Sequence, residues 1–134
     1  MCIRDSAYNC ICANVPAQIA CIAALNEGLD APHYMNKAYI ERRDFLITKL
    51  QTLGFKLDAK PEGAFYIFPS IENFTENDFD FCVDVLEKAH VAMVPGSAFT
   101  DIGKGHVRIS YAYELDALKE AMRRLELYIK EYYE

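Results

Sequence analysis

The run AFYIF, residues 64–68, constrains the fold more than any other part of the sequence. It is too short and too aromatic for a helix, and Pro69 stops it, so it predicts a strand. Both faces of this strand are apolar, and neither can be left in water. The chain therefore needs a sheet with covering layers, and we expect another domain or subunit to supply part of the cover.

Two helical patterns precede this strand. Asn14 as N-cap and Pro16 in the first turn open a short, mostly buried helix that closes at Gly28. A longer helix begins at Asp30 and ends at Gly54, which supplies the position after the last turn. Its apolar stripe recurs at helical spacing and comprises Met35, Tyr39, Leu46, Leu50 and Leu53.

Short strands and two further helices complete the pattern. We expect strands at 55–58, 64–68, 91–94 and 106–112. A helix from Asn77 or Asp78 would bury Phe79, Cys82, Val83 and Leu86, and a terminal helix would bury Leu115, Leu118, Met122, Leu125, Ile129 and Tyr132. The predicted fold class is α/β: a small mixed or antiparallel sheet covered by long helices, in one domain over residues 1–134.

Charge and composition exclude several classes of partner. The chain has 14 Lys and Arg and 20 Asp and Glu, which give a net charge of −6. The basic residues are scattered along the sequence, which argues against nucleic acid as a binding partner. No stretch approaches the length of a membrane span, and no secretory signal pattern opens the chain. The five cysteines include one Cys-x-Cys pair but no second pair at zinc-ligand spacing. We therefore expect reduced thiols, no metal and a cytoplasmic location.

One guanidinium interrupts the strand HVRISYA, residues 106–112. Side chains alternate along a strand, so Val107, Ile109 and Tyr111 share one face and Arg108 lies on the other. Two interpretations of Arg108 follow. It is an exposed residue paired with a surface carboxylate, or it is a recognition fork that binds a carboxylate or phosphate of a ligand through two parallel hydrogen bonds.

Five blocks of sequence carry a family resemblance, in the order ANVPAQIACIAAL (13–25), RRDFLITKLQTLGF (42–55), KPEGAFYIFP (60–69), VAMVPGSAF (91–99) and HVRISYA (106–112). Together they resemble the C-terminal part of a class I/II aminotransferase of fold type I, similar to the aspartate and aromatic enzymes. The resemblance implies the small domain of a pyridoxal-phosphate enzyme. It also implies amino acid and 2-oxo acid substrates, and a homodimer for the full-length protein.

The resemblance implies roles for individual residues. Arg108 would bind the substrate's α-carboxylate, and Phe65 would wall that site. Residues 8–14 correspond to a family loop that approaches the active site of the partner subunit, so Tyr8 or Asn14 would contribute there. The alternatives, which we favour, are a solvated loop residue for Tyr8 and a helix cap for Asn14. Nothing here matches the family's Schiff-base lysine segment, so the resemblance implies a fragment that does not transaminate alone, in which residues 1–6 are a candidate artefact.

Two other functions remain open. A carbon–sulfur lyase of the same fold would use the same arginine, because the reaction depends largely on groups outside the matched region. A stand-alone module that binds an amino acid without chemistry would be soluble and monomeric as given. The fragment hypothesis predicts instead that the isolated chain aggregates or binds a hydrophobic dye.

Overall fold

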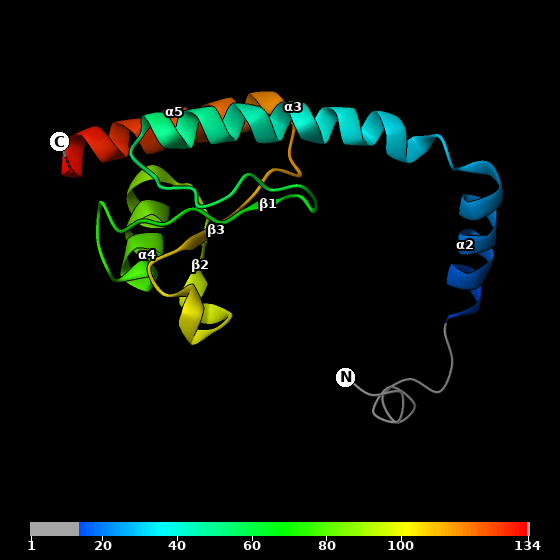
Figure 1. Ribbon diagram of the computed structural model, residues 1–134, viewed down its shortest axis with the longest axis horizontal. Coiled ribbons are helices and arrows are strands. Elements are labelled where there is room, and N and C mark those ends of the chain that lie inside the picture. The colour runs from blue at the N-terminus through cyan, green and yellow to red at the C-terminus, as the bar shows by residue number, and fades with distance from the viewer. Residues whose placement is uncertain (1–13, 134) are drawn as a thin grey trace. The chain divides into compact units, whose positions relative to one another are not determined.

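The computed structural model describes residues 14–133, and the chain divides into two compact units after Lys37 (Figure 1). The first unit contains α2 (Val15–Glu27). The Asn14 side chain accepts a hydrogen bond from the backbone N–H of Ala17 at 3.1 Å, and Pro16 lies in the first turn. The predicted start and end of this helix are therefore confirmed.

The surface of α2 differs from the expectation. The helix was predicted to be mostly buried, but none of its residues is buried within this chain. Its large apolar side chains are 60–69% exposed; they are Val15, Ile19, Ile22 and Leu25. The sequence shows how apolar a helix is, but it does not show whether the covering surface belongs to the same chain.

Helix α3 (Ala31–Thr52) ends just before Gly54, as the sequence predicts. Gly54 adopts a φ of +92°, which an L side chain rarely tolerates, and the N–H of Phe55 donates to the carbonyl of Leu50 at 3.0 Å. In the second unit, Leu46 and Leu50 of the predicted stripe are fully buried.

The sheet has three short strands, β1 (Tyr66–Ile67), β2 (Val94–Pro95) and β3 (Val107–Ser110), in the order β1-β3-β2. Both pairings are antiparallel, with Tyr66 opposite Ser110 and Val94 opposite Arg108. The sheet is thus antiparallel, one of the two arrangements expected.

The predicted strands are longer than the observed ones. Residues 55–58 contribute only the isolated bridge between Lys56 and Ser70. The strand predicted at 64–68 is shortened to β1, because Ala64 has a φ of +59° and turns the chain sharply before Tyr66. Pro69 limits the other end of the strand predicted at 64–68, because proline lacks the N–H that a longer ladder would need.

Helix α4 (Asp78–Ala89) begins after its N-cap Asn77, as predicted, but it buries a different face. Phe79, Val83 and Leu86 are exposed, which corrects the prediction for these three residues. The buried side chains are Asp78, Phe81, Cys82, Val85 and Ala89. Both faces of α4 carry apolar residues. Contacts with the sheet and with the C-terminal helix determine which face is buried.

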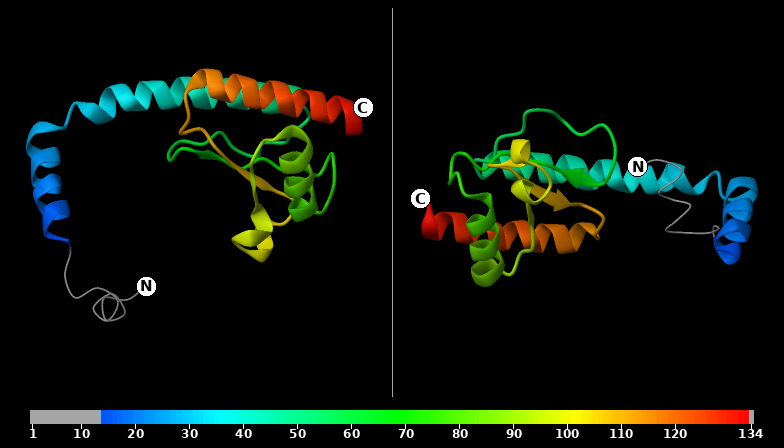
Figure 2. Two further views of the ribbon diagram at one scale, coloured as in Figure 1. Left: turned by 180° about the vertical axis from the view of Figure 1, so that it is seen from behind. Right: turned by 90° about the horizontal axis from the view of Figure 1, so that it is seen from below.

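Helix α5 (Leu115–Tyr132) lies beside the second-unit part of α3, and together they cover one face of the sheet (Figures 1 and 2). Leu118, Met122, Leu125 and Ile129 are buried, as predicted. Tyr132 is 46% exposed, contrary to the expected stripe, because its neighbour Tyr128 occupies the core instead. In the part of the chain that the structure describes, no helix is both long and apolar enough to cross a bilayer.

Candidate functional site

Strand β3 divides its side chains between the core and the candidate site. Val107 and Tyr111 are at most 2% exposed, and Ile109 is also buried. Arg108 and Ser110 alternate with them and are half-buried. The alternation predicted from the sequence is therefore confirmed, and Arg108 lies on the face that α3 and α5 leave open.

Two aromatic rings hold the Arg108 side chain. The guanidinium carbon lies 4.6 Å from the ring centroid of Tyr66 and 4.6 Å from that of Phe99. A cation at this distance from an aromatic ring is attracted by the ring's electron density, and each contact stabilises it by about 0.5–2 kcal/mol. Such contacts restrain the guanidinium without using its N–H donors.

No acid satisfies those donors within residues 14–133. Arg43 pairs with Asp44, and Arg123 and Arg124 both pair with Glu120. Arg108, by contrast, has neither an ion pair nor a hydrogen bond to any Asp or Glu that the structure describes. The surface-pair interpretation therefore lacks a partner here, and the five N–H donors of Arg108 are available to a ligand.

Phe99 comes from a loop that folds tightly back on itself. Two 3-10 turns, η1 (Gly96–Ala98) and η2 (Asp101–Gly103), form this loop. The N–H of Gly96 donates to the carbonyl of His106 at 2.8 Å, which joins the start of the loop to the strand that follows it. The closure brings Phe99 back over β3, where it meets Arg108.

Phe65 lies one ring away from Arg108. Its ring centroid is 4.3 Å from that of Tyr66 and 6.4 Å from that of Tyr39. Its side chain is 39% exposed, so one part of the ring faces out. The structure thus brings Phe65 to the aromatic cluster through Tyr66, and Tyr66 is the residue that contacts the guanidinium.

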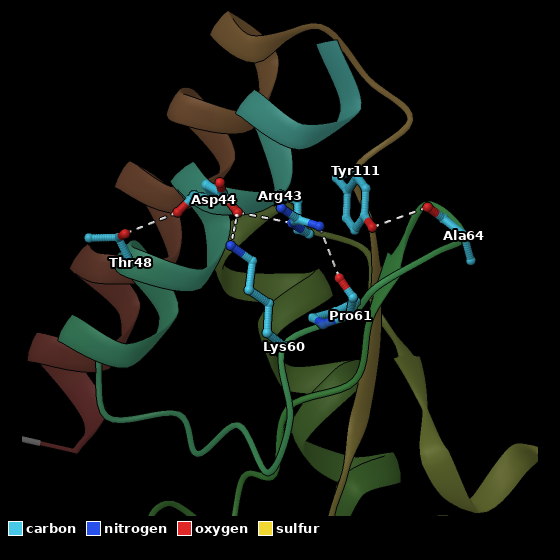
Figure 3. A network of polar contacts seen from close by, with 7 residues as sticks. All are labelled: Arg43, Asp44, Thr48, Lys60, Pro61, Ala64 and Tyr111. Atoms are coloured by element: carbon cyan, nitrogen blue, oxygen red, sulfur yellow. Dashed lines mark hydrogen bonds and ion pairs between the residues drawn. The ribbon is translucent and has the colours of Figure 1, made fainter. Parts of the chain in front are cut away.

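A polar network holds the turn that precedes Phe65 (Figure 3). Arg43 donates from Nη1 to the carbonyl of Pro61 at 3.1 Å, and Lys60 pairs with Asp44 at 2.9 Å. The bond from Arg43, followed by that from Lys60, holds the pKa of the Asp44 carboxyl below its usual value.

Tyr111 fixes the other side of the same turn. Its hydroxyl donates to the carbonyl of Ala64 at 3.1 Å, and its backbone N–H donates to the carbonyl of Phe65 at 2.9 Å. Burial raises the pKa of the Tyr111 hydroxyl, which keeps this donor protonated. The turn before Phe65 is thereby fastened to α3 and to the residue that follows β3.

The two other predicted site residues are Tyr8 and Asn14. Tyr8 lies outside the described residues. The side chain of Asn14 accepts from the backbone N–H of Ala17, so within this chain it caps α2. Its role at a partner subunit stays a prediction.

Lysine is the residue type that a Schiff base would require, and this chain has eight. A Schiff-base lysine needs a desolvated pocket or a neighbouring cation that lowers its pKa. All eight lysines are exposed, and the bond to Asp84 instead raises the pKa of Lys88. Six of them form ion pairs with carboxylates, namely Lys56, Lys60, Lys88, Lys104, Lys119 and Lys130.

The sequence pattern missed two members of the cluster, Tyr66 and Phe99. Both stand in the quoted blocks, but neither was assigned a contact with Arg108. The signal for Tyr66 lies in the register, because a residue opposite Ser110 is a diagonal neighbour of Arg108. The position of Phe99 depends on loop closure, for which local sequence carries no comparable signal.

Comparison with known proteins connects this site to a family. The sequence profile described as "Aminotransferase class I and II" matches residues 3–125. The chain belongs to this family. The strand with Arg108, the loop with Phe99 and the turn before Phe65 all lie inside the matched region of this aminotransferase chain.

Individual relatives agree with that assignment. A probable N-acetyl-LL-diaminopimelate aminotransferase of Bacillus subtilis is 43% identical over 91% of this chain and 31% of its own length. An aspartate aminotransferase of Pyrococcus abyssi is 39% identical over 96% of this chain and 33% of its own. The solved alanine aminotransferase of Pyrococcus furiosus is 42% identical with a TM-score of 0.81, covering 90% of this chain and 31% of that one. The chain therefore spans about a third of the length of the curated relatives it matches.

Proposed function

We propose that this chain forms the small domain of a pyridoxal-phosphate-dependent aminotransferase, in which Arg108 binds the α-carboxylate of an amino acid or 2-oxo acid. The observation that carries the proposal is the set of contacts made by the Arg108 guanidinium. Two aromatic rings restrain its guanidinium, and no carboxylate of residues 14–133 occupies its donors. The two named relatives and the solved enzyme act on different donors, so we propose no single amino acid.

Arg108 suits this role on chemical grounds. A guanidinium is planar and always charged, and it matches the two oxygens of a carboxylate with two parallel N–H donors. The contacts with Tyr66 and Phe99 reduce the freedom that the side chain would lose on binding. When Arg108 holds the substrate's carboxylate, it also sets the orientation of the neighbouring carbon, which is where the substrate reacts.

The cofactor belongs to a part of the enzyme that these residues do not supply. None of the eight lysines of this chain fits the Schiff base, so we derive no step through pyridoxal phosphate. We propose that the complete protein is a cytoplasmic homodimer, and that this chain does not transaminate by itself. The exposed apolar residues of α2 support a covering surface elsewhere in that assembly.

The experiment replaces Arg108 in the complete enzyme that contains this chain. Arg108→Leu should lower kcat/KM for the amino donor by roughly a hundredfold, since the substrate carboxylate loses its charge-assisted bonds. The sharper readout compares the donor with the corresponding primary amine, which lacks the carboxylate. The variant should lose most of the preference for the amino acid.

Arg42→Leu is the matched control, because Arg42 also lies over an aromatic ring, with its guanidinium carbon 5.7 Å from the centroid of Tyr39. It should keep the preference of the unmodified enzyme. If Arg108→Leu retains the full preference for the carboxylate-bearing substrate, the proposed role of Arg108 is wrong.

A further inference from the structure

A buried carboxylate reaches the loop that carries Phe99. Asp78, the first residue of α4, is only 4% exposed. Its Oδ2 accepts a hydrogen bond from the backbone N–H of Ser97 at 2.6 Å, across 19 positions of sequence. Burying a carboxylate is costly unless its oxygens are bonded, so this contact links α4 firmly to the loop.

The bonded N–H lies in the same turn that positions Phe99. Ser97 is the second residue of η1, and the N–H of Phe99 closes that turn by donating to the carbonyl of Gly96 at 3.0 Å. An N–H at the start of a turn has no partner inside it, and η1 has no side-chain cap of its own. Asp78 supplies the missing acceptor from another helix.

We infer that Asp78 is a positioning residue for the carboxylate site: by holding Ser97 it sets where Phe99 lies, and Phe99 restrains Arg108. The inference rests on the proposed function for its effect on substrate, but its geometric part does not. The Asp78 side chain makes neither a hydrogen bond nor an ion pair with Arg108. Its influence passes through one turn of backbone and one aromatic ring.

A purely structural role for Asp78 makes a different prediction. An acidic residue in the first turn of a helix stabilises that helix through its dipole, wherever the side chain points. Asp80 is the matched control, because it lies in the same first turn, is exposed, and contacts Asn77 rather than the loop. If helix stabilisation were the whole role of Asp78, the two aspartates would be equivalent for the site.

The first measurement is the resonance of the Arg108 side-chain Nε–H, recorded by NMR on the complete enzyme that contains this chain. Phe99→Leu gives the reference shift without the ring current of Phe99. Asp78→Ala should move the resonance most of the way to that reference, and Asp80→Asn should leave it in place. An Arg108 resonance that Asp78→Ala does not move overturns the inference, whatever the enzyme's activity. If Asp78→Ala fails to fold, the same comparison uses Asp78→Asn, with a smaller displacement expected.

The second measurement separates KM from kcat in the complete enzyme. Asp78→Ala should raise KM for the amino donor about tenfold, and Asp78→Asn, which keeps an acceptor oxygen, should restore much of the affinity. A loss confined to kcat, in proportion to unfolded protein, would contradict the inference and indicate structural support alone. Failure of Arg108→Leu to alter carboxylate preference would reject the proposed function, yet leave the NMR result to decide the link from Asp78 to Arg108.

Discussion

Gly96 and Gly103 cross so closely that neither position has room for a side chain. A Cβ on Gly96 would overlap the carbonyl oxygen of Gly103, and a Cβ on Gly103 would overlap the carbonyl oxygen of Gly96. The two glycines belong to η1 and η2, the two turns of the loop that carries Phe99. Their contact holds the two turns of this loop against each other.

Gly96→Ala should therefore destabilise the protein by about 3 kcal/mol or more, because the obstructing atoms are backbone and cannot rotate away. Urea denaturation followed by circular dichroism measures the change. Gly63→Ala is the control, since no atom lies within 4 Å of a Cβ built there, and it should change stability by at most about 0.5 kcal/mol. Equal stability of the two variants would contradict the close crossing.

Tyr128→Phe should lower stability in a pH-dependent way. The buried Tyr128 hydroxyl donates to Oδ2 of Asp84 at 2.6 Å, and its loss should cost about 1 kcal/mol. The bond from Lys88, followed by that from Tyr128, lowers the pKa of the Asp84 carboxyl from its ordinary 3.8. This contribution is complete above the unfolded-state pKa and is lost as pH falls through the lower folded-state pKa.

Denaturation at about pH 7 and about pH 3 tests this dependence. The difference between Tyr128→Phe and the unmodified chain should shrink in acid. Tyr113→Phe, at a tyrosine that is 65% exposed and lies just before the same helix, should show no such change with pH. A constant difference for Tyr128→Phe would show that Asp84 is not the partner that matters.

Cys82 should resist alkylation in the folded chain. Burial, with a smaller effect of the Asp78 carboxylate, raises the pKa of the Cys82 thiol to about 12, so the reactive thiolate is scarce at neutral pH. Cys21 is exposed on α2 and should react readily. Iodoacetamide labelling followed by peptide mass spectrometry compares the two sites, and equal labelling in native buffer would refute the prediction.

The isolated chain should bind a hydrophobic dye through α2. The fluorescence of such a dye should fall when Ile19 and Ile22, which are 63% and 60% exposed, are both replaced by lysine. Leu127→Lys changes a 55% exposed leucine on α5 and should have a smaller effect. Low dye binding by an unmodified, monomeric chain would count against the interpretation of this chain as part of a larger assembly.

The helices could be predicted from the sequence because their ends depend on local chemistry. Asn14, Asn77 and Gly54 act through neighbouring backbone groups, and each lies where the pattern placed it. The strands were less predictable, since the length of a short strand depends on a partner far away in sequence. The buried face of α4 was also beyond local patterns, because Phe79 and Phe81 are equally apolar and only tertiary contacts distinguish them.

The candidate site divides in the same way. The face of Arg108 follows from alternation along one strand, so the sequence could predict it. Its aromatic contacts depend on the register of β1 against β3 and on the closure of a loop. Tyr66 and Phe99 therefore became visible only in the structure, as did the bond from Ser97 to Asp78.

The alternation along β3 also determines how this segment can change. Substitutions at Arg108 and Ser110 change the open face of the sheet, while Val107, Ile109 and Tyr111 keep the interior intact. Loss or gain of one codon within the strand would exchange the two sets at once, placing a charge in the interior and an aliphatic side chain at the site. Point mutation can therefore change the open face of β3 without disturbing the core, whereas insertion or deletion within β3 cannot.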